Sequence, residues 1–126
     1  MTELTPEQVE KITSLAQDFA REGRTDELVE FLDHGFPLEA TGADSNTLLM
    51  LAAYNGQVAT TRTLLERGAD PDALNERNQS IIAGALFKGE AEIVALLRDA
   101  GADLDLGTPT ARAAAEMFGR TDLLQG

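Results

Sequence analysis

The chain has 126 residues, of which 43% are hydrophobic and 25% are charged, as in an ordinary soluble, folded protein. Its 22 acidic residues against 10 Lys and Arg give a net charge of −12, so it lacks the basic surface that nucleic acids and anionic membranes require. The absence of Cys excludes disulfides, thiolate metal sites and Cys nucleophiles.

The N-terminal sequence, MTELTPEQVEK, is acidic and has no apolar region, so we expect no secretory signal and a cytoplasmic protein. No apolar run approaches the ~18–20 residues of a membrane span. An acidic surface favours a basic partner through electrostatic steering, although solubility alone is a sufficient reason for such a surface. We expect a monomer.

The sequence repeats with a period of 33 residues. The segment GADPD at 68–72 returns as GADLD at 101–105. Two series of glycines keep the same spacing: Gly23, Gly56 and Gly89 in one, and Gly35, Gly68 and Gly101 in the other. Periods of about 20–50 residues are typical of stacked repeat arrays, in which each repeat packs on its neighbours.

The first predicted element is a helix that begins after Thr5, because Thr5-Pro6 followed by Gln8 is a typical helix start. An apolar stripe predicts which face of this helix packs inward: Val9, Ile12, Ala16, Phe19 and Ala20. Gly23 should end the helix. A second helix over Asp26–Asp33 should bury Leu28, Phe31 and Leu32. This lengthened first pair is predicted to close the N-terminal end of the array.

Further helix pairs follow at the repeat spacing. A loop rich in small residues over Glu39–Asn46 precedes helices predicted at Thr47–Asn55 and Val58–Arg67. A second loop over Leu74–Gln79 precedes helices at Ser80–Lys88 and Ala91–Ala100. The last pair is shortened: its loop has lost about three residues, its inner helix is predicted at Ala111–Phe118, and Gly119–Leu124 has room for barely one helical turn.

These repeats resemble the ankyrin repeat family, whose pattern runs D-x-x-G-x-T-P-L-H-x-A-A-x-x-G and ends in L-L-x-x-G-A-D-x-N. In the second repeat the matching residues are Thr47, Leu49, Ala52, Ala53, Gly56, Leu64, Leu65, Gly68, Ala69 and Asp70. In the third they are Ser80, Ile82, Gly89, Glu92, Ile93, Val94, Leu96, Leu97, Gly101, Ala102 and Asp103. The departures are Leu48 and Ile81 in place of Pro, Met50 and Ala83 in place of His, and Thr60, Thr61 and Thr63 at usually apolar positions.

The resemblance implies an all-α ankyrin solenoid of about four repeats, over residues 5–39, 40–73, 74–106 and 107–126, within one domain. It also implies β-hairpin fingers in the loops before the inner helices. In the second finger Asn78 stands where the family has Gly, and Asn tolerates the positive φ that the turn requires.

The resemblance further implies a protein-binding surface on the concave face, where inner helices end. There it places Arg21, Tyr54, Asn55, Phe87, Lys88 and Met117. Finger tips, which contact partners in the family, add Asp44, Asn46, Glu76, Arg77 and Gln79. Aromatic residues and Met are enriched at interfaces, so Tyr54, Phe87 and Met117 predict an apolar ladder. Two alternatives stay open: Phe87 and Phe118 could pack between helices as core, and each finger residue could simply face solvent.

Catalytic and metal sites are not indicated. His34 lies near a helix end without neighbouring residues that would form a catalytic set, and the Asp pairs at 70/72 and 103/105 fall in the helix-to-finger turns. We therefore expect no enzyme activity and no cofactor. The preferred function is a protein-interaction module. The alternatives are an accessory or inhibitory subunit of one enzyme, and a small-ligand-binding protein with a pocket between Tyr54, Phe87 and the fingers.

Overall fold

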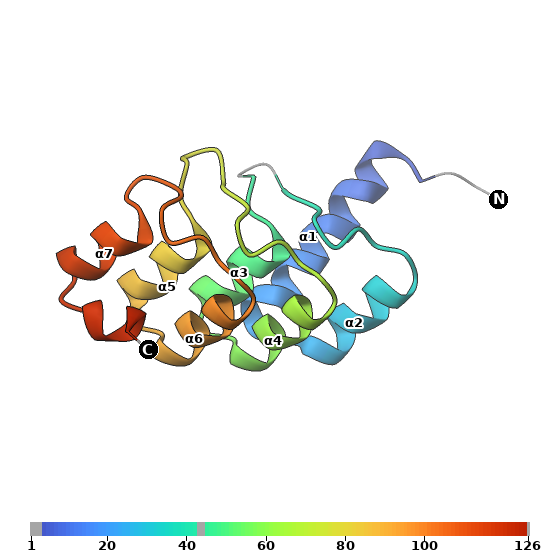
Figure 1. Cartoon of the computed structure of the whole chain (residues 1–126). Coiled ribbons are helices and arrows are strands. Elements are labelled where there is room, and N and C mark those ends of the chain that lie inside the picture. Colours follow the sequence, from blue (N-terminus) through green and yellow to red (C-terminus); the bar gives the residue numbers. More distant parts are fainter. Residues whose placement is uncertain (1–3, 43–44, 126) are drawn as a thin grey trace.

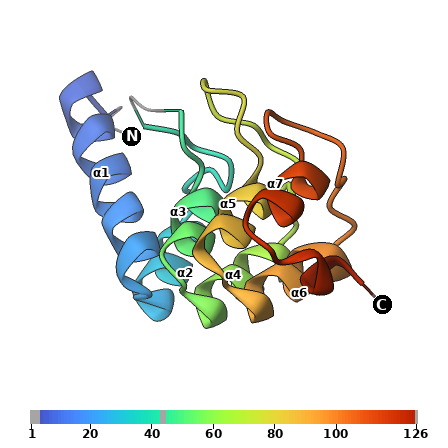
Figure 2. The same ribbon diagram turned by 90° about the vertical axis from the view of Figure 1, so that its left-hand side faces the viewer.

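The molecule is a row of helix pairs, arranged as two layers. The computed structural model describes residues 4–42 and 45–125. Its helices are α1 Pro6–Glu22, α2 Thr25–Asp33, α3 Leu48–Tyr54, α4 Val58–Glu66, α5 Ile81–Lys88, α6 Ala91–Asp99 and α7 Ala111–Met117, followed by the 3₁₀ helix η1 Thr121–Leu124. Helices α1, α3, α5 and α7 stand side by side as the inner layer, and α2, α4 and α6 form the outer layer (Figure 1). The loops between pairs project together at one edge (Figure 2).

Each inner helix starts at a hydroxyl residue that caps it. The Thr5 hydroxyl accepts a hydrogen bond from the Gln8 N–H, and the Gln8 side chain accepts one from the Thr5 N–H, which completes a capping box. The side chains of Thr47, Ser80 and Thr110 each accept a bond from the N–H three residues later, at 3.2, 3.2 and 3.1 Å. Such caps stabilise a helix by about 1 kcal/mol each, and they set where each inner helix begins.

Glycines in the left-handed conformation end the first three inner helices, as the repeat spacing predicts. The backbone φ angles of Gly23, Gly56 and Gly89 are 73°, 74° and 72°. This conformation strains residues that carry a Cβ atom, so a glycine here lets the chain turn at once into the outer helix.

The core is the contact zone between neighbouring helices. Its largest fully buried apolar side chains are Leu28, Leu48, Leu49, Leu64, Ile82, Leu86, Ile93, Val94 and Leu97. Small residues allow the inner helices to approach closely: Ala16, Ala20, Ala52, Ala53, Ala85, Ala111, Ala114 and Ala115 are fully buried. Thr60 and Thr61 are also buried, and the Thr60 hydroxyl lies 2.7 Å from that of Thr25 on the preceding outer helix. Thr60 thus compensates for its polarity with a bond between repeats.

The structure corrects the prediction for the start of α1. Val9, predicted to face inward, keeps 47% of its surface exposed, whereas Ala16, Phe19 and Ala20 are buried. The reason is length: α1 is more than twice as long as α3, so its first turns extend past the neighbouring helix (Figure 1). Predicted helix limits elsewhere differ by about one residue, because Thr47 and Ser80 cap their helices from outside.

The fingers are less regular than the predicted hairpins. Among the described residues the one β-bridge joins Leu74 and Ser80 in the second finger, and no bridge forms within 39–42 and 45–46 of the first. Asn78 has a φ of 61°, as predicted for its turn. The Asn78 side chain donates to the Thr108 hydroxyl at 3.0 Å, and the Thr108 N–H donates to the Asn78 carbonyl at 2.9 Å. The second finger therefore supports the third.

The last repeat ends in a single short turn, η1, where an outer helix would stand. Arg98 of α6 holds it by donating to the carbonyls of Leu123 at 3.4 Å and Gln125 at 3.1 Å. Leu123 and Leu124 pack against the core. The shortened sequence predicts barely one helical turn here, and η1 has four residues.

Candidate functional site

A groove lies where the inner helices α3, α5 and α7 meet the fingers. Its volume is about 500 Å³. Apolar residues of the inner helices form most of its surface: Met50, Leu51, Tyr54, Ile81, Ala83, Gly84, Phe87, Ala114 and Phe118. Residues of the fingers and the helix start complete it: Asn46, Asn75, Arg77, Gln79, Ser80 and Pro109. The fold thus combines an apolar floor with a polar edge.

The aromatic residues of the groove remain accessible. Tyr54 keeps 47% of its surface exposed and Phe87 keeps 50%, although both belong to helices whose other faces are buried. Exposed aromatic surface rimmed by polar groups is typical of interaction sites. The alternative that Phe87 belongs to the core is wrong.

Phe118, rather than Met117, continues the aromatic row. The rings of Phe87 and Phe118 pack edge to face, with centroids 5.1 Å apart and planes at 70°. Phe118 is half-buried and lines the groove, whereas Met117 is 66% exposed and is not among the lining residues. Met117 holds the position equivalent to Phe87, but among the described residues no inner helix follows α7. The ladder predicted from spacing therefore ends in Phe118, one residue later.

Two cationic side chains border this apolar surface. The Lys88 ammonium lies 5.1 Å from the centroid of the Tyr54 ring, a cation–π contact between adjacent repeats. Arg77 lines the groove from the second finger, and its guanidinium is exposed. The groove thus offers aromatic faces next to positive charge.

Asn75 organises the second finger. Its Oδ1 accepts hydrogen bonds from the N–H groups of Arg77 at 3.0 Å and Gln79 at 3.1 Å. Its Nδ2 donates to the side chains of Gln79 at 2.9 Å and Asn46 at 3.3 Å. Asn75 was not predicted as a site residue. Its position in the turn, where the ankyrin pattern D-x-x-G-x-T has Asp, could have indicated it. It fixes the finger backbone that carries Arg77.

Of the other predicted site residues, some line the groove, some lie outside it, and one falls outside the described residues. Asn46 and Gln79 line the groove, whereas Glu76 is exposed beyond it. Asn55 donates to the Leu51 carbonyl at 2.7 Å and serves the end of α3, outside the lining residues. Arg21 also lies outside the groove, paired with Asp18 at 2.5 Å. Asp44 lies outside the described residues.

The Asp pairs lie in the helix-to-finger turns, as the sequence predicts, and there they have hydrogen-bond partners. Asp70 and Asp103 each accept the N–H group two residues later, both at 2.9 Å. Neighbouring turns are also joined: Glu39 accepts from the Asp70 N–H at 2.9 Å, and Asp72 accepts from the Asp103 N–H at 2.7 Å. These bonds link successive repeats, and no cluster of three potential metal ligands occurs among the described residues.

His34 is exposed, and its Nδ1 lies 2.8 Å from the Glu30 carbonyl of the same helix. It lines no part of the groove. Among the described residues, none of the helices combines the length and the hydrophobicity of a membrane-spanning segment.

Stacked helix pairs with projecting fingers define a helical repeat protein. The family model for ankyrin repeats (3 copies) matches residues 16–108, so the chain belongs to the ankyrin repeat family. Ankyrin repeats generally mediate protein–protein interaction and are not catalytic.

Relatives among curated proteins share part of this array. Cyclin-dependent kinase 4 inhibitor B from Mus musculus is 41% identical over 68 residues, 54% of this chain and 52% of the inhibitor. Probable E3 ubiquitin-protein ligase XBOS31 from Oryza sativa subsp. japonica is 33% identical over 97 residues, 74% of this chain and 22% of the relative. Ankyrin repeat and KH domain-containing protein mask-1 from Caenorhabditis elegans is 46% identical over 48 residues, 38% of this chain and 2% of the relative. The chain therefore matches at most about half the length of these relatives.

Proposed function

We propose that this chain is a protein-interaction module that binds a segment of another protein in the groove between α3, α5, α7 and the fingers. The observation that carries the proposal is the half-exposed pair Tyr54 and Phe87 on the groove floor. Exposed aromatic residues at the centre of a concave, polar-rimmed surface are typical binding hot spots.

A closed small-molecule pocket is less well supported. Small-ligand sites are concave and enclose most of the ligand, whereas Tyr54 and Phe87 on the groove floor are 47% and 50% exposed to solvent. An open groove of this kind suits a protein segment that enters from the side.

An inhibitory role toward one enzyme is the second candidate. It is favoured by the similarity to the cyclin-dependent kinase 4 inhibitor, which covers 54% of the chain. The distinction lies in what the bound partner does. If the partner is an enzyme, its turnover measured with increasing amounts of this protein should fall in step with occupancy of the groove, whereas a scaffold would leave it unchanged.

The test begins with photo-crosslinking through benzoylphenylalanine placed at position 87. Crosslinked proteins are then titrated against the wild-type chain and against the double variant Tyr54→Ala/Phe87→Ala. We expect the double variant to lose at least ~2 kcal/mol of binding free energy, the usual scale of a hot spot.

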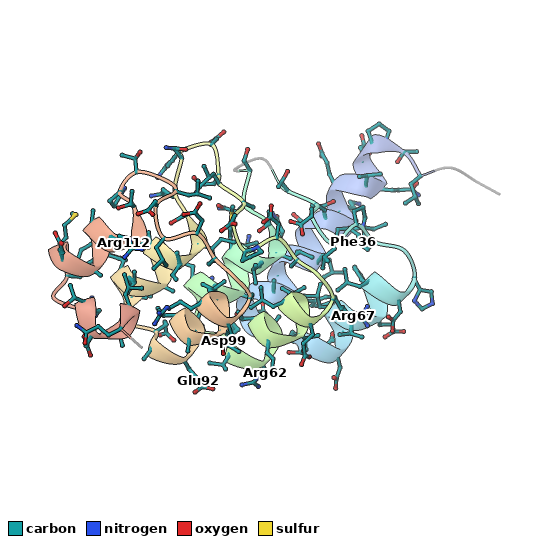
Figure 3. All side chains as sticks on the ribbon, in the orientation of Figure 1. Phe36, Arg62, Arg67, Glu92, Asp99 and Arg112 are labelled. Atoms are coloured by element: carbon teal, nitrogen blue, oxygen red, sulfur yellow. The ribbon has the colours of Figure 1, made fainter. Side chains whose placement is uncertain are left out.

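Two control variants match this change. Leu15→Ala removes a side chain of similar exposure, 44%, on α1 outside the groove. Arg62→Ala alters the outer helix α4, on the side opposite the fingers (Figure 3). Both should bind normally. If Arg62→Ala weakens binding and the double variant does not, the outer face is the binding surface and the proposal fails. Arg98 is an unsuitable control because it holds the C-terminal turn.

A further inference from the structure

The positive charges of this acidic protein are distributed unevenly, and the distribution indicates the chemistry of the partner. Five of the 10 Lys and Arg residues form ion pairs with carboxylates: Arg21, Arg24, Arg62, Arg67 and Arg112. Two more, Arg98 and Arg120, donate to backbone carbonyls. Within the described residues, the cations without such partners are Lys11, Arg77 and Lys88. Two of these three border the groove.

Neither of the two cations at the groove, Arg77 in the lining and Lys88 beside it, is neutralised by an ion pair within the described part of the chain. The finger backbone at Arg77 is fixed through Asn75, while the guanidinium itself makes no ion pair within the described part of the chain. Lys88 rests over the Tyr54 ring at 5.1 Å, a contact that orients the ammonium but leaves its charge. Each side chain can therefore still bind an anionic group.

Among the described residues, the groove lining contains no carboxylate. Its one charged member among them is Arg77, although the whole chain carries 22 acidic residues. Among the described residues, the acids nearest in sequence to the lining are Glu76 on the finger and Glu116 on α7, and both are exposed and lie outside the lining. Salt screens the repulsion from exposed acids that lie farther away than a Debye length of about 8–10 Å. The charge that an anionic group meets on entering the groove is therefore the positive charge of the nearby Arg77 and Lys88.

We propose that the partner of this groove is an acidic protein segment that combines an apolar or aromatic side chain with a neighbouring Asp or Glu. The inference rests on the proposed function and specifies its ligand. The apolar side chain lies against Tyr54, Phe87 and Phe118. The carboxylate accepts hydrogen bonds from the Arg77 guanidinium, whose planar donors suit a bidentate pair, or from Lys88. This reverses the expectation of a basic partner, which considered only the net charge.

The test selects linear peptides from a random phage-displayed library on the wild-type protein. Enriched peptides are then titrated against Arg77→Glu, with Arg62→Glu as the matched control, since both variants change the net charge equally. We expect enriched peptides to contain a Leu or aromatic residue beside Asp or Glu. Arg77→Glu should weaken their binding roughly tenfold, as the loss of one charge-assisted hydrogen bond does. Arg62→Glu should change it less than about twofold.

Exchanging the charges of the peptide and of position 77 tests whether the peptide's acidic residue contacts Arg77. Replacing the acidic residue of an enriched peptide with Lys should weaken binding to the wild-type chain and restore binding to Arg77→Glu. The inference is overturned if the peptides require Tyr54 and Phe87 but are basic or neutral, or bind Arg77→Glu as tightly as wild type; the proposed function then stands. If no peptides are enriched, or if they bind Tyr54→Ala/Phe87→Ala unchanged, both the inference and the groove assignment fail.

Discussion

Side chains of the following repeat donate hydrogen bonds to backbone carbonyls at the C-terminal ends of the inner helices α1 and α5. At the end of α1, the Gln57 Nε2 donates to the Arg21 carbonyl at 2.8 Å. At the end of α5, an Arg120 Nη donates to the carbonyls of Leu86 at 3.1 Å and Phe87 at 3.2 Å. Such bonds satisfy carbonyls that have no partner within the helix.

Glu90, 33 residues after Gln57, holds the equivalent place at the end of α3. Unlike the Gln57 amide, its carboxylate cannot donate a hydrogen bond to the carbonyls there. Its Oε2 would lie 3.1 Å from a Cβ atom added to Gly56, so the carboxylate sits directly against the end of α3. An ionised carboxylate cannot donate a hydrogen bond. Among the described residues its side chain makes no hydrogen bond or ion pair. We predict that Glu90→Gln stabilises the protein by donating to the Tyr54 carbonyl, as Gln57 does one repeat earlier.

The expected gain is about 1 kcal/mol. One added amide–carbonyl hydrogen bond contributes roughly 0.5–1.5 kcal/mol net. Removing the charge relieves its repulsion from the C-terminal end of α3 and loses its attraction to the N-terminal end of α6, two effects of roughly 0.3–1 kcal/mol each that oppose one another. For a chain of 126 residues, 1 kcal/mol corresponds to a rise of about 4 °C in Tm.

Urea unfolding followed by far-UV circular dichroism measures this gain as a higher midpoint at an unchanged m-value. The matched control is Glu92→Gln, an identical change two residues later on α6, where the carboxylate is exposed and lies 3.6 Å from Arg62. If Glu92→Gln stabilises equally, general relief of the net negative charge explains the gain. If Glu90→Gln is neutral or destabilising, the reasoning about the end of α3 is refuted.

Three further changes probe the array. Gly89→Val should cost more than about 1 kcal/mol, because a β-branched residue is strained at the φ of 72°, even if the Arg120 guanidinium moves aside; an unchanged urea midpoint would contradict this. Deletion of residues 1–22 uncovers α3 and should give an aggregating or molten product by size-exclusion chromatography and dye binding, whereas a soluble fragment that unfolds cooperatively would show that the remaining repeats suffice. Phe118→Ala should cost about 1–3 kcal/mol through the lost ring contact with Phe87, and Met117→Ala under about 0.5 kcal/mol; equal losses in thermal unfolding would refute the assignment of Phe118.

Helix limits and turns could be predicted from the sequence because they depend on neighbouring residues. Thr5 caps with Gln8, Gly23 permits a left-handed turn, and Asn78 replaces a turn glycine, each through bonds or backbone angles within a few residues. Tyr54 could be placed on the accessible inner face by the resemblance to ankyrin repeats, with the repeat spacing giving its position. The caps and turns follow from local chemistry.

Other features depend on what stands beside a residue in space. The stripe through Val9 is a sound helical pattern, but nothing in that pattern states how far the next helix extends. Met117 and Phe118 are adjacent in sequence, and the spacing alone does not state which of them packs on Phe87; in the structure it is Phe118, directly after α7. Pairing of Lys and Arg likewise depends on three-dimensional neighbours, so the unpaired state of Arg77 could not be predicted.

The hydrogen bonds from backbone N–H groups to carboxylates of the preceding turn repeat along the array, as contacts repeat along a one-dimensional crystal. A shift of one repeat carries the bond between Glu39 and Asp70 onto the bond between Asp72 and Asp103, with nearly the same length, 2.9 and 2.7 Å. Each interior repeat therefore presents one surface that accepts a preceding copy and another that accepts a following copy. Within the described residues, the long α1 and the short η1 flank these interior repeats. A duplicated 74–106 segment inserted before residue 107 meets matching surfaces on both sides, so evolution can lengthen the groove by whole units without redesigning its core.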